Sequence, residues 1–306
     1  MGEWSKKVGE VGEEIVYEFL SLIGWSDAQK GIELPCSLVK HNVSTHGIDY
    51  FLSLNSQLIN RTLDNLVISV KYTSKPYPSS PSGKFKDHFV DLAKAIECFK
   101  KSTLRKESNL AASSIDQSRD IGILFWLTNN ATSCSDVISK VASTRKVEGY
   151  NYDTIYLVDN HRISFIYDTL KNIQASNPQS KVEFFYPSTG KNYNPSNRET
   201  SGYILPVEYI NSSILPIKLT NQDGSKTLVL SSIDDFHKDR LKKLIGLAQD
   251  LSSGLTSSTN ILFPDFNSLE DSNDVQSSKI GFKDKEFTRS ISVGSYRGDF
   301  KEAINA

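Results

Sequence analysis

Two apolar runs of strand length limit the folds that this chain can adopt. Residues 65–71 and 121–127 are almost continuously apolar, and polar residues follow each run. Strands of this kind are buried on both faces, as in sheets with helices packed on either side. Segments with helical periodicity separate the strand-like segments as far as residue 176. The first half of the chain therefore predicts a layered α/β domain with a central sheet, over residues 1–176.

The first helix is predicted by apolar residues at three- and four-residue steps. They form one stripe: Val8, Val11, Ile15, Val16, Phe19, Leu20 and Ile23. Gly24 follows in a position typical of a helix end. Gly9 and Gly12 lie inside the helix, where each glycine costs about 1 kcal/mol relative to alanine. Each of these two glycines therefore needs a packing or functional reason.

The composition changes after the first domain. Residues 177–202 are rich in Asn, Pro, Ser and Tyr and are predicted to form a linker. Residues 203–255 predict a small α+β domain, in which a hairpin turning at Asp223-Gly224 precedes a helix. Residues 256–306 are rich in Ser and Asp and have little periodicity, so we expect a loosely structured tail that is available for docking a partner.

Charge and cysteine content exclude several classes of protein. The 306 residues carry 35 basic and 36 acidic side chains, so a polycationic coat is excluded and any nucleic-acid site must be local. The three cysteines are far apart, which excludes a disulfide framework or a CxxC-type zinc site and suits a reducing compartment. We see no apolar run of about 18 residues and no signal peptide, so we expect a cytoplasmic protein without a membrane partner.

Four polar residues carry the chemical prediction: Glu13, Asp49, Ser69 and Lys71. Ser69 and Lys71 are two residues apart on one predicted strand and therefore point to the same face. If the strand that starts near Asp49 is its neighbour, the Asp49 carboxylate and the Lys71 ammonium meet at one end of the sheet, where the helix of Glu13 packs. Two carboxylates and a hydroxyl suit Mg²⁺, and a lysine beside them can orient a metal-bound water and offset phosphate charge.

These residues lie in motifs that resemble the PD-(D/E)xK nuclease superfamily, which has the restriction-endonuclease-like fold. Gly9-x-x-Gly12-Glu13 resembles its opening helix, and Gly47-Ile48-Asp49 resembles the strand with its first metal-binding aspartate. Ile68-Ser69-Val70-Lys71 stands in the place of its (D/E)xK strand. Leu127-Thr128-Asn129-Asn130 and Leu157-Val158-Asp159 resemble later segments of the restriction-type branch, which includes nucleases of phage-defence operons.

The resemblance implies a restriction-endonuclease-like core, with a central mixed sheet flanked by helices, followed by a C-terminal α+β domain. It also implies an endonuclease that cuts DNA rather than RNA, with Mg²⁺ or Mn²⁺ bound by Asp49 and Glu13 and the attacking water positioned by Lys71. Ser69 replaces the second acidic residue of the family, and a neutral hydroxyl is a weaker ligand. With no ATPase motif in the chain, we expect a homo-oligomer or a complex with a second defence protein.

A local basic segment follows the predicted site. Residues 71–106 contain nine basic and three acidic residues, and aromatic residues lie among them. This predicts a phosphate-contacting surface with Lys75, Lys84 and Lys86, although a solvated surface would have the same composition. Two alternatives to a nuclease remain: a non-catalytic nucleic-acid-binding subunit on a degenerate nuclease fold, which Ser69 would suit, and a scaffold subunit.

The histidines offer a rival chemistry. His46 lies three residues before Asp49, and such a pair can bind a transition metal or transfer protons. At this spacing we expect His46 to support the site or to lie on the surface. The other histidines show no spacing typical of metal ligands.

Overall fold

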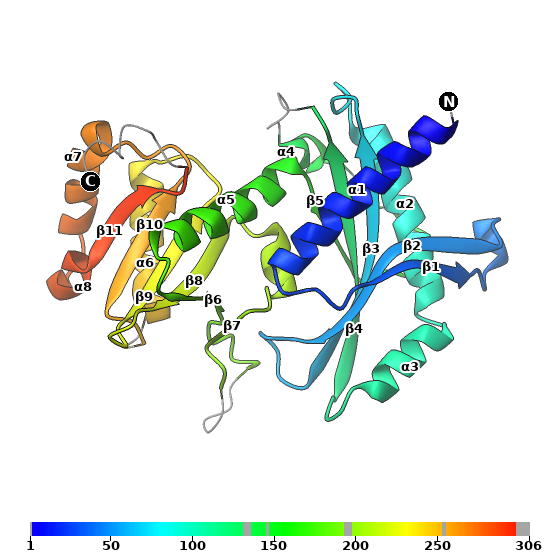
Figure 1. Cartoon of the computed structure of the whole chain (residues 1–306), viewed down its shortest axis with the longest axis horizontal. Helices are drawn as coiled ribbons and strands as arrows, with labels where there is room; N and C mark the ends of the chain where they lie inside the picture. The colour runs from blue at the N-terminus through cyan, green and yellow to red at the C-terminus, as the bar shows by residue number, and fades with distance from the viewer. Residues whose placement is uncertain (1, 131–135, 145–146, 193–197, 253–254, 298–306) are drawn as a thin grey trace. The chain divides into compact units, whose positions relative to one another are not determined.

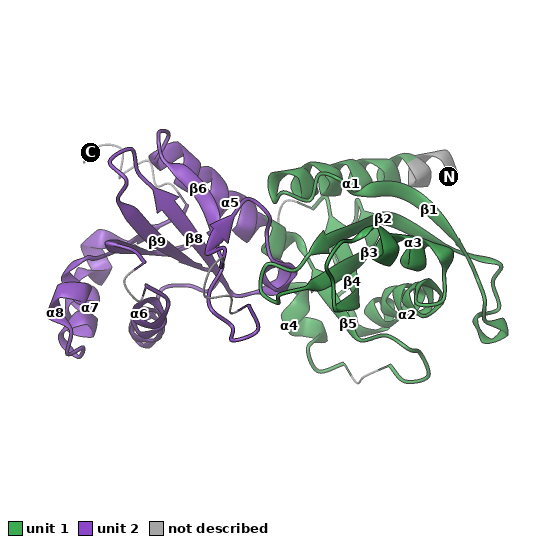
Figure 2. Cartoon of the chain, turned by 90° about the horizontal axis from the view of Figure 1, so that it is seen from below, with its two compact units in different colours: residues 1–163 green, residues 164–306 purple. Residues whose placement is uncertain are grey.

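The computed structural model describes residues 2–130, 136–144, 147–192, 198–252 and 255–297 (Figure 1). The chain divides into two compact units, Met1–Ile163 and Ser164–Ala306, which are coloured separately in Figure 2. Each unit is built on a β-sheet of its own. No helix within the described ranges is both long enough and apolar enough to cross a membrane.

The first unit is a five-stranded mixed sheet with α1 on one face and α2 and α4 on the other (Figure 2). Its elements are α1 (Gly2–Leu22), β1 (Gln29–Pro35), the 3-10 helix η1 (Val39–His41), β2 (Thr45–Asn55), β3 (Thr62–Thr73), α2 (Ser82–Phe99), α3 (Thr103–Ala111), β4 (Gln117–Thr128), α4 (Val137–Val141) and β5 (Thr154–Val158). The strand order is β1-β2-β3-β4-β5, with β1, β2 and β3 antiparallel and β3, β4 and β5 parallel. This arrangement confirms the predicted central mixed sheet flanked by helices.

The two apolar runs of the sequence form the centre of this sheet. All residues of β3 from Thr62 to Ser69 are buried, as are those of β4 from Asp120 to Thr128. A large apolar cluster lies between the sheet and α2. The strands contribute Val67, Leu124 and Trp126, and the helix contributes Leu92, Ile96 and Phe99. Burial on both faces explains why these strands are apolar without alternation.

Helix α1 covers the opposite face with only part of its predicted stripe. Val16, Phe19, Leu20 and Ile23 are buried, and the Phe19 ring meets the Phe125 ring edge-on at 6.1 Å between centroids. Val11 and Ile15, which the periodicity placed in the same stripe, are exposed. The helix therefore contacts the sheet mainly through its second half and through one close contact nearer its start.

Gly12 makes that close contact possible. A Cβ atom at this position would overlap the Cβ atom of Tyr72 on β3 and would lie 2.6 Å from Tyr72 Cγ. A Cβ atom at Gly9 would have no neighbour within 4 Å. Gly12 thus has the packing reason that its helical position demands, because only a residue without a side chain lets the helix approach the strand this closely.

The second unit contains a six-stranded sheet of order β11-β10-β9-β8-β6-β7. Its elements are α5 (Asn160–Ser176), which begins at the end of the first unit, β6 (Lys181–Phe185), β7 (Ser201–Gly202), the 3-10 helix η2 (Val207–Asn211), β8 (Ile214–Thr220), β9 (Lys226–Ser232), α6 (Lys238–Ser252), β10 (Ser258–Phe263), α7 (Ser268–Ile280), α8 (Lys285–Arg289) and β11 (Ile291–Ser295). β8 and β9 form the predicted hairpin, while β9, β10 and β11 are parallel.

The structure differs from the sequence-based domain scheme in this half. The division into compact units falls after Ile163 rather than at residue 176. The segment 177–202, predicted as a linker, contributes β6 and β7 to the sheet, and the tail predicted as loose contains β10, α7, α8 and β11. Helix α7 buries only Val275 and Ser278, so its sequence carries almost no helical pattern. Residues 298–306 of the predicted tail lie outside the described residues.

Candidate active site

The Asp49 carboxylate lies against the end of β3. Asp49 lies on β2 between two paired residues: Ile48 pairs with β1, and Tyr50 pairs with both β1 and β3. Asp49 itself is not among the residues paired with either strand. Its Oδ2 atom instead accepts a hydrogen bond from the backbone N–H of Val70, at 2.6 Å. Val70 is the residue between Ser69 and Lys71, so the carboxylate is held one residue away from both.

Ser69 and Lys71 lie on the α2 face of the sheet. In the parallel β3–β4 ladder, Ser69 pairs with Leu124 and Lys71 with Trp126, and both β4 partners belong to the apolar cluster under α2. Paired residues of neighbouring strands share a face. The Ser69 side chain is buried, and Lys71 is only partly exposed. The predicted same-face relation of these two residues therefore holds in the structure.

Lys71 lines a cavity of about 450 Å³ together with other basic residues. Lys75 comes from the loop after β3, and Lys84 and His88 come from the first turns of α2. Lys84 and His88 are four residues apart and so lie on the same face of the helix. Two of the three predicted phosphate-contacting lysines thus lie with Lys71, whereas Lys86 is exposed on α2 and is absent from the cavity lining.

His88 reports the electrostatics of this cavity. Burial, followed by the charges of Lys71 and Lys84, lowers the pKa of His88 to about 4. The imidazole is therefore neutral at physiological pH, and the positive charge of the cavity belongs to its lysines. A pocket lined by three ammonium groups favours anions such as phosphate. His88 is not among the predicted site residues, although its four-residue spacing from Lys84 could have placed both on one helix face.

Glu13, the second predicted metal ligand, has a cationic partner of its own. Its carboxylate forms an ion pair with Lys30 of β1, at 3.2 Å between Oε2 and Nζ. Hydrogen bonding to Glu13 raises the pKa of Lys30. The backbone carbonyl of Glu13 accepts a hydrogen bond from the Tyr50 hydroxyl at 2.9 Å, which ties α1 to the residue after Asp49. The Asp49 carboxylate is thus bonded to the β3 residue next to Lys71, while Glu13 on α1 pairs with Lys30.

The Thr128 motif fixes the loop that carries Lys75. The Thr128 hydroxyl donates to the backbone carbonyl of Lys75 at 2.6 Å. Asn160, which follows the second motif, accepts hydrogen bonds from the Thr128 N–H at 2.9 Å and from the Tyr77 hydroxyl at 2.7 Å. The same Tyr77 hydroxyl lies 2.6 Å from the carbonyl of Trp126. These contacts position the cavity wall and need no catalytic role for either motif.

Asp159 joins the starts of two helices. Its buried carboxylate accepts hydrogen bonds from the backbone N–H groups of Val137 at 2.9 Å and of Arg162 at 3.0 Å. Burial raises the pKa of this carboxyl group. The residue therefore satisfies unpaired N–H groups at the first turns of α4 and α5.

The family comparison covers the first unit. A family model described as "GAPS4 protein PD-(D/E)XK nuclease domain" matches residues 1–162. The chain belongs to this family. The match ends one residue before the unit boundary at Ile163, so the GAPS4 nuclease domain and the five-stranded unit coincide. Comparisons with curated proteins and with solved structures give no match.

Membership in the GAPS4 nuclease family confirms the resemblance inferred from the motifs. GAPS4 PD-(D/E)XK domains form a bacterial anti-phage defence nuclease family. A nuclease domain implies a nucleic-acid substrate, and PD-(D/E)XK nucleases generally use divalent metal ions.

Proposed function

We propose that this GAPS4-family chain is a Mg²⁺-dependent DNA endonuclease that acts against phage or foreign DNA, with Asp49 and Lys71 at its catalytic centre. The observation that carries the proposal is the 2.6 Å hydrogen bond between the Asp49 carboxylate and the Val70 N–H, at the end of β3 beside a lysine-lined cavity. A metal-binding carboxylate, a lysine and a cationic pocket are the parts that phosphodiester hydrolysis needs.

The donor atoms at this place fit a hard cation. The carboxylate of Asp49 has several acceptor positions, of which the Val70 N–H occupies one, and the Ser69 hydroxyl adds a neutral oxygen. Mg²⁺ prefers such oxygen ligands and retains several waters, which makes one of them a better nucleophile. Mn²⁺ takes the same oxygen ligands and is expected to substitute. Glu13 adds a further carboxylate ligand when its ion pair with Lys30 opens, or when the carboxylate contacts Lys30 and the metal ion together.

The remaining residues bind and orient the substrate. Lys71, which follows the Val70 N–H that binds the Asp49 carboxylate, holds the attacking water, while its ammonium offsets charge that develops on the phosphate. Lys75 and Lys84 line the same cavity and bind phosphate groups of the DNA backbone. Lys86 is exposed on α2 outside this cavity and is proposed to contact a more distant phosphate of the same DNA. DNA as the substrate, and a second copy or a second defence protein as the partner, follow from the family resemblance.

The test is cleavage of plasmid DNA, linear DNA and RNA by the full chain, with Mg²⁺, Mn²⁺ or EDTA. We expect DNA cleavage that EDTA abolishes. Asp49→Asn and Lys71→Met should each reduce the rate by about 10²-fold or more, since each removes a group that acts in the transition state. Glu33→Gln and Lys106→Met alter exposed residues of the same unit and serve as matched controls that keep the wild-type rate. Equal rates in the Asp49, Lys71 and control variants would exclude this catalytic centre.

A non-catalytic DNA-binding subunit is the second candidate, because Ser69 is neutral and buried where the family has an acid. Ser69→Asp separates the two functions. If the wild type is a degenerate nuclease, it binds DNA without cutting it and Ser69→Asp gains cleavage. If the wild type already cuts DNA, the substitution only changes its metal affinity. Salt-insensitive or absent DNA binding by the wild type would support a scaffold role instead.

A further inference from the structure

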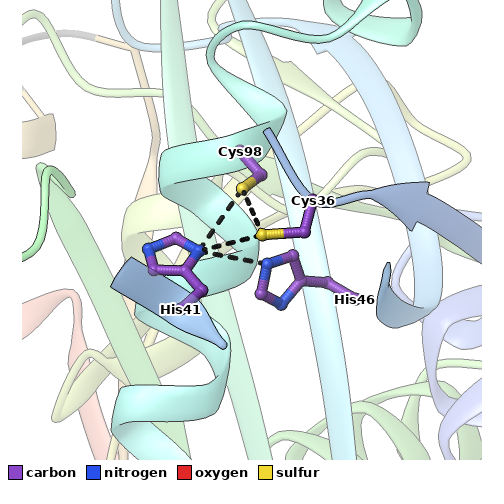
Figure 3. Close-up of side chains that lie close together, drawn as sticks. All are labelled: Cys36, His41, His46 and Cys98. Carbon is purple, nitrogen blue, oxygen red and sulfur yellow. Dashed lines mark hydrogen bonds between the residues drawn. The ribbon is translucent and has the colours of Figure 1, made fainter. Parts of the chain in front are cut away.

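Two cysteines and two histidines meet at one end of the first unit, outside the proposed catalytic centre (Figure 3). Cys36 follows β1, His41 ends η1, His46 lies on β2 and Cys98 lies in the last turn of α2. Their ligand atoms all lie within 4.8 Å of one another. We propose that Cys36, His41, His46 and Cys98 bind a structural zinc ion.

The distances within the cluster match a tetrahedral zinc site. The two sulfur atoms are 3.7 Å apart, the His41 Nδ1 atom lies 3.5 Å and 3.4 Å from them, and it lies 3.2 Å from the His46 Nε2 atom. Zinc bonds of about 2.3 Å to sulfur and about 2.05 Å to nitrogen give tetrahedral edges of about 3.8 Å, 3.6 Å and 3.3 Å for these three kinds of pair. A disulfide is excluded as the reason for the approach, since its sulfur atoms would be about 2.05 Å apart.

Hydrogen bonding alone does not account for the cluster. The Nδ1 atom of His41 is approached by both sulfur atoms and by Nε2 of His46. A ring nitrogen has either one N–H or one lone pair, so it cannot bond all three neighbours. A cation at the centre resolves this, because all four groups can then direct a lone pair toward one point.

The surroundings of His41 select the tautomer that zinc needs. Its other ring nitrogen, Nε2, lies 2.9 Å from Oε2 of Glu97, and Lys40 lies 2.8 Å from Oε1 of the same carboxylate. With Nε2–H donating to Glu97, the lone pair of Nδ1 faces the cluster. A carboxylate that orients a metal-binding histidine in this way is a common feature of zinc sites.

Burial and ligand type point to a structural rather than a catalytic ion. His41, His46 and Cys98 are buried, and Cys36 is half-buried. Two thiolates and two imidazoles fill all four positions of a tetrahedral zinc and leave none for a substrate. The ion would fasten the irregular connection between β1 and β2 to the end of α2. His46 is buried and its ring contacts His41, so the expected surface position is wrong.

The test is the metal content of the full chain, purified without chelator. We expect about one zinc per chain by elemental analysis, released by a thiol-modifying reagent, and a lower melting temperature after its removal. Cys98→Ser and His41→Asn should each lose zinc, whereas Cys134→Ser, the matched cysteine control, should retain it. Co²⁺ exchanged into the wild type should show tetrahedral absorption with thiolate charge transfer, which does not depend on the variants being stable.

The proposal is overturned if the wild type takes up neither Zn²⁺ nor Co²⁺ in one-to-one amount, or if the double variant Cys98→Ser/His41→Asn retains full zinc. The outcome is independent of the nuclease assignment, because Asp49→Asn should lose cleavage and keep its zinc. Zinc retention together with unchanged cleavage in Asp49→Asn would refute the catalytic centre and leave the zinc site standing.

Discussion

The contact between Gly12 and Tyr72 gives a quantitative test of how α1 is seated on the sheet. Gly12→Ala would place a Cβ atom in overlap with Tyr72 Cβ and 2.6 Å from Cγ, where the favourable separation of carbon atoms is about 3.5–4.0 Å. Overpacking costs about 1–3 kcal/mol and occasionally more. We take about 3 kcal/mol, because the overlapped Cβ atom is attached directly to the strand backbone. The helical preference for alanine returns about 1 kcal/mol, so the net loss is about 2 kcal/mol.

Gly9→Ala is the matched control on the same helix. A Cβ atom there has no neighbour within 4 Å, so only the helical preference acts and the variant should gain about 1 kcal/mol. The two variants should differ by about 3 kcal/mol in the free energy of unfolding, measured by urea denaturation. For a unit of this size, a loss of about 2 kcal/mol lowers the melting temperature by about 4–8 °C.

A double-mutant cycle identifies the cause of the loss. Tyr72→Ala keeps the Cβ atom that Gly12→Ala would overlap, so Gly12→Ala should still be destabilising in that background. Tyr72→Gly removes the atom, and Gly12→Ala should then cost nothing or stabilise the protein. If Gly12→Ala is as stable as Gly9→Ala, or if Tyr72→Ala relieves its cost as fully as Tyr72→Gly, the reasoning is refuted.

Three further predictions concern buried polar groups. Arg119→Ala should lower the free energy of unfolding in urea by about 3–5 kcal/mol, because it removes the guanidinium that lies 2.6 Å from the buried Asp64 carboxylate. Arg61→Ala breaks an exposed ion pair and should cost less than about 1 kcal/mol. The pKa of His88 is about 4 in the folded state against 6.5 unfolded, so the unfolded state binds more protons between these values. The stability that the neutral His88 ring contributes is complete above pH 6.5 and is lost as the pH falls toward 4. Between pH 7 and pH 5 the free energy of unfolding should therefore fall by about 1–2 kcal/mol more in the wild type than in His88→Gln. Equal losses would contradict the lowered pKa of His88. Tyr77→Phe should cost about 1–3 kcal/mol, since it removes the hydroxyl that bonds the buried Trp126 carbonyl, whereas Asn160 Oδ1 still accepts from the Thr128 N–H; calorimetry that shows no change would contradict this.

The sequence predicts best those elements whose burial is complete or periodic. β3 and β4 are buried on both faces and therefore appear as unbroken apolar runs. The meeting of Asp49 with the end of β3 could also be anticipated, because consecutive strands are usually neighbours and side chains alternate between faces. β1 was missed, since it is an edge strand in which only Leu34 is buried, and its Lys30 was therefore missed as the partner of Glu13.

Contacts that depend on tertiary proximity leave no such pattern. Cys36 and Cys98 are far apart in the chain and show no spacing typical of zinc ligands, yet the end of α2 brings them within 3.7 Å. Likewise, the second sheet contains β6 and β10 because their backbones pair with β8 and β9, although the flanking Ser, Asn and Pro residues are typical of loops. Local composition describes the connections of these strands better than the strands themselves.

β2 carries a residue of each proposed metal site, His46 and Asp49, only three positions apart. Ligand chemistry keeps the two ions distinct. Thiolates and imidazoles bind Zn²⁺ far more strongly than Mg²⁺, whereas a carboxylate, a hydroxyl and water suit Mg²⁺ and leave room for a substrate phosphate. A closed site with four protein ligands also exchanges its ion more slowly than an open one that keeps several waters. Brief chelation should therefore stop cleavage while the zinc remains, and added Mg²⁺ should restore cleavage fully. Irreversible loss of cleavage on the time scale of zinc release would instead show that the ion at His46 holds the start of β2, and with it Asp49, in place.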